Sequence, residues 1–566
     1  MAKLDAAAVS KLLHELAQRL ELAGDNPYRA RAYSRAAENL LLSPLPLQQL
    51  IAEDRLTEIP GIGEALAAVI TQLHETGAHP RLEAMREAVP AGVLEMLRVP
   101  GLRRERVQKL YKELGLASVA DLEDAARSGR LAATKGFGAA FQAKVLQGLA
   151  MQSGPQGRHL HRAAAALRFA ADAIAREHLE WTDVTPAGEF RRGCELVGAL
   201  SLVAADPHLD GADRTMEQGD QLVVHVTHPE RFGIALLLAT GSDAHIDALR
   251  ALARRKDLRF DREGVSRNGR VIARRTEQEI YAALGLPYIA PELRETGKEV
   301  PLALKGKRPE LVTGDDLRGV LHAHTTESDG SDSLQDMAEA TRKRGYAYLG
   351  LTEHSQSAHY AGGLKEDEVA RQQRAIDRLN KRYGRDFHVF KGIESDILGD
   401  GSLDYPDEVL ASFDLVIASI HSKFRLGRKE QTDRIVKAVE NPYTTILGHV
   451  TGRQLMRRPG YEVDMERVLR ACAEHGVAIE INAHPWRLDM DWRWCERGLE
   501  LGCLFSINPD AHSAVEIDNI QWGVLMARKG AVPKGRVLNA FGLSEFREHL
   551  QNRKLRSRAG TSRACS

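Results

Sequence analysis

The second half of the sequence repeats one pattern, in which a short apolar run of β type ends on a side chain that can bind a cation. The run 415–420, for example, leads directly into His421, and the run 445–448 leads into His449. These terminal side chains are imidazoles and carboxylates, without a thiolate: His322, His324, Asp329, His354, Glu394, His421, His449, Asp510 and His512. Such a donor set favours Mn²⁺, Zn²⁺ or Fe²⁺ at a catalytic site with open coordination positions over a closed structural zinc.

Helical stretches separate these apolar runs, and the alternation predicts a parallel barrel from about residue 317 onward. A parallel barrel gathers the C-terminal ends of its strands on one face, so ligands that are distant in the sequence would converge there. Closely spaced divalent ions activate water near neutral pH and neutralise charge on a phosphoryl group. The chain has 21 histidines, and those away from the strand ends are interpreted as ordinary core or surface groups. The pattern therefore predicts a metal-dependent phosphoesterase site.

The first 150 residues repeat a different motif, an apolar residue and a glycine turn that opens a new helix. Three copies occur, at residues 59–63, 99–103 and 134–138, and the second has Arg103 where a second glycine is usual. Such turns expose backbone N–H groups at a helix start, where a phosphate oxygen binds without any base being read. The repeat predicts helix-hairpin-helix DNA binding. The candidate DNA contacts are Gly61, Gly63, Gly101, Gly136, Gly138, Arg29 and Arg31.

The composition limits how the chain could bind DNA. Its 78 Lys and Arg residues balance 78 Asp and Glu residues, so binding must depend on local basic patches. The five cysteines are scattered and are interpreted as reduced thiols. The N-terminus lacks the apolar core of a signal peptide, and no run of about 18 apolar residues could span a membrane. We therefore expect a cytoplasmic, nucleoid-associated protein without a membrane partner, and a monomer of several domains.

The strand-end motifs together resemble the polymerase and histidinol phosphatase (PHP) domain. The matching motifs are His322-Ala323-His324 with Asp329, Glu353-His354-Ser355, Gly392-Ile393-Glu394, Ser419-Ile420-His421, Gly448-His449 and Pro509-Asp510-Ala511-His512. The resemblance implies a distorted (β/α)7 barrel that holds two to three divalent metals, Mn²⁺ or Zn²⁺ and possibly Fe²⁺. It implies one ion bound by His322, His324, Glu394 and Asp510, a second by Glu394, His421 and His449, and a third by Asp329, His354 and His512. Glu394 would bridge two ions.

Two arginines are candidate phosphate contacts in the PHP-like half, because Arg453 and Arg487 follow the fifth and sixth strand ends. The alternative is that both form surface salt bridges. With the ligands that the resemblance assigns to the first ion, Arg453 completes the expected catalytic group. That group is His322, His324, Glu394, Asp510 and Arg453.

Residues 1–300 resemble bacterial family X DNA polymerases, in the basic aromatic stretch 26–33, the glycine turns and the motif at 240–242. The palm of that family carries a Gly-Ser turn, two arginines, an Asp-x-Asp pair and a third aspartate on a later strand. Ala199 and Ser201 occupy the first two aspartate positions here, and the third falls near Val223. These side chains cannot hold the two Mg²⁺ ions that nucleotidyl transfer needs. We therefore predict that polymerase activity is lost.

The resulting expectation is a multidomain chain with α-helical helix-hairpin-helix N-terminal domains, a degenerate α+β nucleotidyltransferase-like palm and thumb, and a C-terminal barrel of PHP type. The expected domains are a helical DNA-binding domain (1–82), a fingers-like helix-hairpin-helix domain (83–152), a degenerate palm (153–240), a thumb-like domain (241–300), a PHP phosphoesterase domain (317–550) and a disordered basic tail (551–566).

The predicted function is DNA repair by a metal-dependent 3′-to-5′ exonuclease that acts on gapped, nicked or 3′-ended DNA. AP endonuclease and 3′-phosphatase activities are further options for the same site. Two alternatives stay open: an active gap-filling polymerase of family X, and a small-molecule phosphatase of the histidinol phosphatase type. Roughly 300 residues of DNA-binding type argue against the second alternative, because a metabolite enzyme has no use for them.

Overall fold

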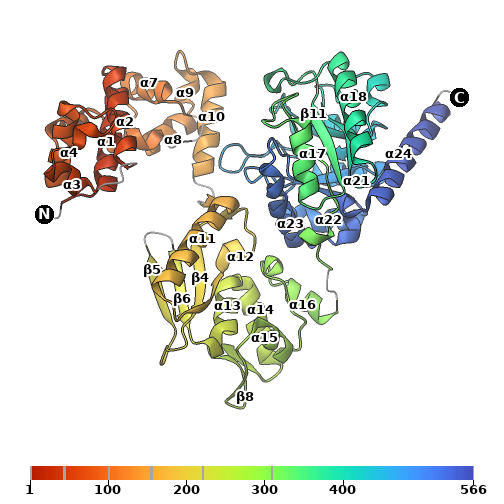
Figure 1. The fold of residues 1–566 in the computed structure, drawn as a ribbon, viewed down its shortest axis with the longest axis horizontal. Helices are drawn as coiled ribbons and strands as arrows, with labels where there is room; N and C mark the ends of the chain where they lie inside the picture. Colours follow the sequence, from red (N-terminus) through yellow and green to blue (C-terminus); the bar gives the residue numbers. More distant parts are fainter. Residues whose placement is uncertain are drawn as a thin grey trace. The chain divides into compact units, whose positions relative to one another are not determined.

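The computed structural model describes residues 3–41, 46–97, 99, 102–152, 157–218, 222–306 and 310–564. The chain divides into two compact units, Met1–Pro155 and Gln156–Ser566, which Figure 1 draws in red to orange and in yellow to blue. Helix-hairpin-helix-like turns fall in the first unit, and the candidate metal ligands fall in the second. None of the described helices is long and apolar enough to cross a membrane.

In its described residues the first unit has helices and no strand, and it contains two apolar cores. One core is built by the first five helices and includes Leu13, Leu16 and Ile70, and the other combines Leu22 of α1 with residues from Val89 to Leu149. The helices are α1 (Ala6–Ala23), α2 (Pro27–Leu41), α3 (Leu47–Ala52), α4 (Glu64–Thr76), α5 (Pro80–Ala88), α6 (Ala91–Met96), α7 (Arg104–Leu114), α8 (Val119–Arg127), α9 (Arg130–Ala133) and α10 (Gly138–Gln152).

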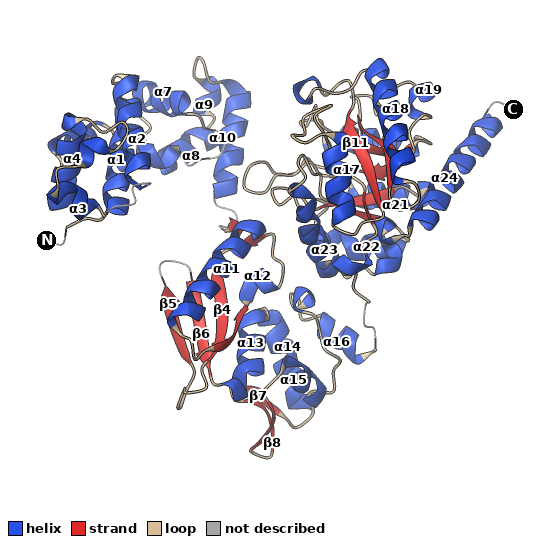
Figure 2. Ribbon diagram, viewed as in Figure 1, coloured by secondary structure: helices blue, strands red, loops and turns tan. Residues whose placement is uncertain are grey.

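The second unit begins with an α+β part that carries a four-stranded sheet. The strand order is β2-β4-β6-β5, with β4 and β6 parallel and in register. The elements are β1 (Arg158–His159), α11 (Leu160–Glu177), β2 (Thr182–Pro186), α12 (Gly188–Arg191), β3 (Leu196–Val197), β4 (Leu200–Ala205), β5 (Arg214–Gln218), β6 (Leu222–Thr227) and α13 (Phe232–Thr240). Helices α11 and α12 and the strands β4 to β6 are labelled in Figure 2.

A smaller α+β part follows, with a three-stranded antiparallel sheet packed on helices. Its own apolar core runs from Ile234 to Ala303. The elements are α14 (Asp243–Arg255), β7 (Arg259–Asp261), β8 (Gly264–Arg267), β9 (Arg270–Ala273), α15 (Glu277–Ala283) and α16 (Glu299–Leu304). The order of these parts agrees with the palm and thumb that the sequence predicts.

The C-terminal part is a nearly closed barrel of seven parallel strands, hydrogen-bonded in sequence order. A parallel bridge between Ala323 and Ala511 joins the first and last strand ends, where His324 N–H donates to the Ala511 carbonyl at 2.8 Å. The strands are β10 (Gly319–Val320), β11 (Tyr348–His354), β12 (His388–Asp396), β13 (Leu415–Ser419), β14 (Thr444–Leu447), β15 (Ala478–Asn482) and β16 (Phe505–Asn508). The predicted (β/α)7 fold class is confirmed.

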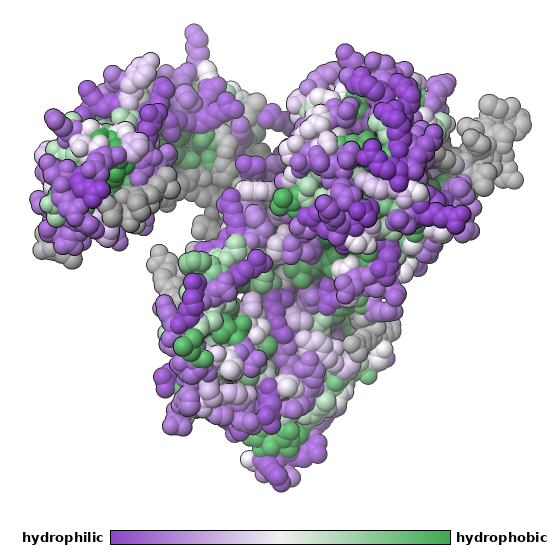
Figure 3. All heavy atoms as spheres, in the orientation of Figure 1, coloured by the Kyte–Doolittle hydropathy of each residue, from purple (hydrophilic) through white to green (hydrophobic). Residues whose placement is uncertain are grey.

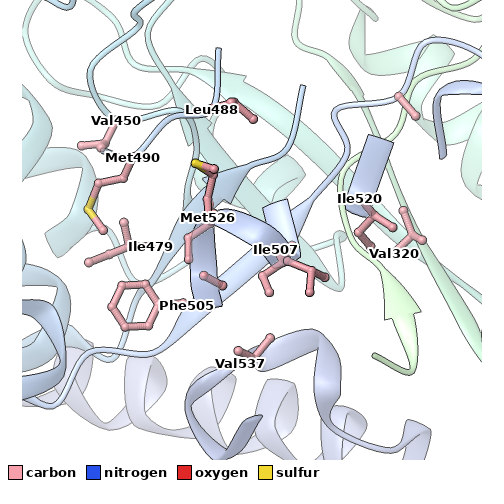
Figure 4. Packing of buried hydrophobic residues seen from close by; sticks show 14 of the residues in the cluster. Val320, Val450, Ile479, Leu488, Met490, Phe505, Ile507, Ile520, Met526 and Val537 are labelled. Atoms are coloured by element: carbon pink, nitrogen blue, oxygen red, sulfur yellow. The ribbon is translucent and has the colours of Figure 1, made fainter. Parts of the chain in front are cut away.

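Helices surround the barrel strands (Figure 2). They are α17 (Leu334–Lys343), α18 (Glu366–Tyr383), α19 (Asp407–Leu410), α20 (Arg428–Glu440), α21 (Met465–His475), α22 (Cys495–Leu501), α23 (Ile520–Lys529) and α24 (Leu543–Ala564). Figure 4 shows how Phe505 and Ile507 of β16 pack near Met526 of α23 and Val537. On the face shown in Figure 3, hydrophilic side chains predominate over the barrel.

The basic tail does not match its expected disorder, because α24 continues to Ala564. The segment 551–559 contains helix-forming Gln, Arg, Lys and Leu and no proline or glycine, so nothing in it stops the helix. Arg553 also anchors this helix, since its guanidinium donates to the carbonyls of His475, Gly476 and Thr444. The prediction of disorder was wrong for residues 551–564.

The palm packs directly on the barrel within the second unit. One apolar core includes Leu167 of α11 and Leu202 of β4 together with the barrel strands. Ion pairs join the thumb-like part to the barrel as well: Lys529 of α23 lies 2.6 Å from Glu295, and Arg528 lies 2.7 Å from Glu292. The polymerase-like part and the barrel therefore form one continuous structure.

A buried ion pair in the palm and thumb makes the stability of this unit depend on pH. Burial alone would raise the pKa of Glu277, but hydrogen bonds from Arg191 and Arg294 lower it to about 2. Because the folded-state pKa is depressed, this contribution is complete above pH 4.5 and is lost as the pH falls toward 2. We expect on the order of 3 kcal/mol of stability to be lost across that window.

Thermal unfolding at pH 6 and pH 3 measures this effect. Glu277→Gln should lower the midpoint at pH 6 and flatten the fall in midpoint between the two pH values. The exposed Glu263 provides a matched control, because Glu263→Gln should leave the pH dependence unchanged. Equal pH dependence in wild type and Glu277→Gln would contradict the expected role of this carboxylate.

Candidate metal centre

The barrel brings all nine predicted ligand residues together at the C-terminal ends of its strands. Glu394, on β12, lies at the middle of this cluster. Its Oε1 is 2.9 Å from His449 Nε2, 3.4 Å from His421 Nε2 and 3.5 Å from His322 Nε2. Its Oε2 is 2.9 Å from His354 Nδ1. One carboxylate therefore touches imidazoles from four other strand ends, which is the geometry of a bridging ligand.

Two further carboxylates complete the cluster on either side of Glu394. Asp510 Oδ1 lies 3.5 Å from His322 Nε2 and 3.3 Å from His324 Nε2. Asp329 Oδ1 lies 3.5 Å from His354 Nε2 and 3.4 Å from His512 Nε2. The loop between β10 and α17 thus places Asp329 next to the last residue of β11 and a residue that follows β16.

The ligand atoms fall into three overlapping groups, each with its atoms within 4.8 Å of one another: His324, Asp329, His354 and His512; His322, His324 and Asp510; and His354, Glu394 and His421. The PHP resemblance implies similar sets, but there His324 and His354 each contribute to one ion. In the structure both imidazoles belong to two groups. His449 reaches Glu394 without joining a group, so the assignment of ligands to ions stays a prediction.

The electrostatics of the cluster fit a site that holds cations. Burial opposes the charged form of His354, but the carboxylates of Glu394 and Asp329 raise its pKa to about 10. Burial together with the charge of His354 lowers the pKa of His324 to about 3. His322 Nε2 and His324 Nε2 are buried and make no hydrogen bond to any described residue. Buried ring nitrogens that face carboxylates without a hydrogen bond are suitable donors for a metal ion.

A second layer of carboxylates orients the imidazoles. Glu480 of β15 is fully buried, and its Oε1 lies 2.6 Å from His322 Nδ1 while its Oε2 accepts from His449 N–H at 2.7 Å. Asp396 of β12 lies 2.6 Å from His421 Nδ1 in the same way. Such partners fix the ring orientation and leave Nε2 to face the ion.

Neither of these two second-layer residues was among the ligands that the strand-end pattern predicts. A signal was present for Glu480, because it interrupts the apolar run Ile479 to Ile481 in a strand that is buried throughout. A buried charge in a barrel strand needs a partner, and the partner here is a ligand histidine. Asp396 follows Glu394 by two residues and lies on the same face of its strand.

The two candidate phosphate contacts lie in different environments. Arg453 donates from Nε to the Arg487 carbonyl at 3.0 Å and from Nη2 to the Leu488 carbonyl, and its Nη1 lies 3.2 Å from Asp491. Its guanidinium is therefore used to hold the loop after β15 and is not brought to the ligand cluster. The side chain of Arg487 in that loop is brought there, with Nε 3.6 Å from Asp510 Oδ2.

The predicted glycine turns of the first unit open helices as the sequence indicates. Gly61 has φ +84° and precedes Gly63, the residue before α4. Gly136 has φ +93°, and Gly138 is the first residue of α10. Positive φ explains the glycine at positions 61 and 136, because other residues adopt it at a cost. Gly101, in the second copy, lies outside the described residues.

The candidate DNA contacts Arg29 and Arg31 lie at the surface of α2. Arg29 pairs with Asp25 at 3.2 Å and stays about half exposed. The guanidinium of Arg31 lies 5.2 Å from the ring centre of Tyr28, which is itself 75% exposed. Both cations are accessible, but neither has a contact that distinguishes DNA binding from an ordinary charged surface.

Comparison with known proteins agrees with this arrangement. A helix-hairpin-helix domain matches residues 5–79, and a SAM-like helix-hairpin-helix tandem matches residues 93–145. The DNA polymerase beta thumb matches residues 235–295, and the PHP domain matches residues 321–484. A Bacillus subtilis protein named DNA polymerase/3′-5′ exonuclease PolX is 34% identical over 96% of this chain and 99% of its own length. The chain belongs to the bacterial family X DNA polymerases that carry a PHP domain.

The barrel of this family X polymerase also matches smaller proteins. A Thermoanaerobacter protein named probable phosphatase is 26% identical over 41% of this chain and 94% of its own length. A probable phosphatase of Vibrio parahaemolyticus is 30% identical over 38% of this chain and 87% of its own length. PHP domains are metal-dependent, and the His, Asp and Glu groups of this barrel could hold metal ions. The helix-hairpin-helix and thumb domains indicate DNA binding.

The three positions that the family resemblance matches to aspartates lie close together in the palm. Ser201 pairs in register with Val223 across β4 and β6. Ala199 lies just before β4, two residues from Ser201. All three carry neutral side chains.

The arginines of the same palm are already paired. Arg191 donates to Glu277 from both Nη atoms at 2.8 and 2.7 Å, and Arg192 Nε donates to Glu295 at 2.9 Å. Glu189 replaces the usual serine of the Gly-Ser turn, and its Oε2 accepts from Gly198 N–H at 2.6 Å. A triphosphate would have to compete with these carboxylates for both guanidiniums.

Proposed function

We propose that this protein is a 3′-to-5′ DNA exonuclease whose active site is the ligand cluster of the barrel. The observation that supports this most is the convergence of nine imidazoles and carboxylates around Glu394 in a chain that also carries helix-hairpin-helix and thumb domains. Its substrate would be gapped, nicked or 3′-ended DNA, bound by a monomer. Cleavage at abasic sites and removal of 3′-phosphates are further reactions that the same site could perform.

Two to three divalent ions, Mn²⁺ or Zn²⁺ with Fe²⁺ as a further option, would occupy the cluster. Bound there, they supply positive charge for the scissile phosphate and lower the pKa of water. Glu394 would hold the ions together with the imidazoles that lie around it. Glu480 and Asp396 would keep the rings of His322 and His421 in the ligating orientation. Arg487 would contact a phosphate oxygen beside Asp510.

The palm would have no polymerase activity. Ala199, Ser201 and Val223 offer no carboxylate for Mg²⁺, and two metal ions are needed for nucleotidyl transfer. Asp206, the nearest aspartate after Ser201, follows the opposite end of β4 and cannot replace them. The palm would then serve to support the barrel, since it shares an apolar core with the barrel.

Metal removal tests the proposed function. Protein treated with EDTA should leave a 5′-labelled single strand intact, and adding Mn²⁺ should restore shortening from the 3′ end. A strand with a 3′-phosphate and a duplex with an internal abasic site, assayed in parallel, separate the three possible reactions. Shortening that persists in excess EDTA after dialysis would contradict a metal-dependent site.

A further inference from the structure

One aromatic side chain is exposed beside the ligand cluster. Tyr360 lies in η5 (His359–Ala361), a short turn that follows β11, and 71% of its surface is exposed. Its ring centre lies 6.2 Å from that of His354 and 6.4 Å from that of His421. Both histidines are candidate metal ligands. If a ligand binds with its phosphate at the metal centre, the groups next to that phosphate therefore lie close to the Tyr360 ring.

The turn that carries Tyr360 is firmly anchored. Ala358 and Ala361 on either side are buried, at 0% and 2% exposure. The backbone N–H of Ala358 donates to the Ser355 carbonyl at 2.9 Å, so the turn is tied to the end of β11. A Cβ at Gly363 would lie 1.9 Å from the Ser355 oxygen, so only glycine fits there. The exposure of Tyr360 is thus imposed by a packed turn.

Other exposed apolar side chains of the barrel lie in loops at the same end of the strands. Among its described residues, 310–553, the large apolar side chains that are exposed are Tyr360, Met456 and Val515. They lie in the loops after β11, β14 and β16, on the face where the strands end. The exposed ring of Tyr360 gives an apolar surface directly beside the ligand cluster. Next to a cluster of carboxylates, imidazoles and Arg487, such a surface fits a ligand with both a phosphate and a flat apolar group.

We propose that Tyr360 stacks on the base of the terminal nucleotide that the barrel removes. This inference rests on the proposed exonuclease function and names one of its substrate contacts. Every base has a π-face, so stacking on Tyr360 would add affinity without sequence preference. The phosphodiester would lie at the metal centre and the base against the ring, so the leaving nucleotide is held at both ends.

The test compares two strands of equal sequence in the presence of Mn²⁺. One ends in an ordinary 3′ nucleotide, and the other ends in a tetrahydrofuran residue, which has the phosphate but no base. Tyr360→Ala should lower kcat/KM for the first cleavage of the ordinary strand about tenfold, mainly through KM. On the strand without a terminal base, Tyr360→Ala should have a kcat/KM within about twofold of the wild-type value, because no base is present to stack on the ring. Tyr360→Phe should retain wild-type rates on both strands.

A matched control is Phe169→Ala, which removes another aromatic side chain that is 73% exposed, on α11 outside the barrel. It should change neither rate. If Tyr360→Ala lowers kcat/KM equally on both strands, or on neither, the stacking role is overturned while the exonuclease function stays intact. Wild-type protein that shortens neither strand would overturn the exonuclease function and the stacking role with it.

Discussion

Replacing Glu394 with glutamine should abolish DNA hydrolysis. Removal of a residue that only hydrogen-bonds to a metal ligand already lowers metal affinity or activity about 10–100-fold. Removal of the ligand that contacts most of the cluster should therefore lower kcat by at least about 1,000-fold. Glu394 contacts imidazoles from four other strand ends, and no other carboxylate of the cluster contacts as many among the described residues. A neutral amide in its place would supply one weaker oxygen and no negative charge for the ions.

Inductively coupled plasma measurement of bound metal, together with strand shortening in Mn²⁺, tests this effect. The matched control is Glu408→Gln on α19, an exposed glutamate of the same barrel, which should keep wild-type metal content and rate. The variant Glu394→Gln should lose both metal and activity. If it keeps more than a tenth of the wild-type rate, Glu394 does not bridge the ions.

No extension of a primer should occur on a gapped template with Mg²⁺ or Mn²⁺ and all four nucleotides. The family resemblance matches Ala199, Ser201 and Val223 to the three metal-binding aspartates, and these side chains could not hold the ions that activate the primer hydroxyl. Arg191 and Arg192 are also paired with Glu277 and Glu295. We expect incorporation at least about 1,000-fold below that of an active two-metal polymerase.

The Bacillus subtilis relative, assayed in parallel on the same template, serves as the positive control for extension. Restoring the carboxylates with Ala199→Asp/Ser201→Asp/Val223→Asp separates two causes of inactivity. If the triple variant extends the primer, the missing carboxylates are the main cause of the inactivity. If it does not, the pairing of the two palm arginines with glutamates also contributes. Extension by the wild-type protein would contradict the silent palm.

The ligand cluster could be predicted from the sequence because two simple patterns combine. Apolar runs indicate where buried strands end, and a parallel barrel places all of those ends on one face. His322 and Asp510 are 188 positions apart in the sequence, yet their ligand atoms lie 3.5 Å apart. The prediction required only strand boundaries and topology, which the period of the apolar residues already indicates.

Other features depend on where side chains point, and the sequence does not determine that. Arg453 follows a strand end as the ligands do, but its long side chain turns to the carbonyls of Arg487 and Leu488. His354 joins two ligand groups because its two ring nitrogens face different carboxylates. Glu480 likewise acquires its role only in the folded barrel, where its carboxylate lies beside His322. Rotamers and packing set these contacts, and no local pattern records them.

The measurement that tests the account most directly is degradation of end-labelled single-stranded and gapped DNA with Mn²⁺, with and without nucleotides, by wild type and by His322→Ala/His324→Ala. We predict that wild-type protein shortens both substrates from the 3′ end, that the double variant does not, and that neither protein extends a primer. Extension without shortening would contradict the account, because the active site would then lie in the palm and not in the barrel.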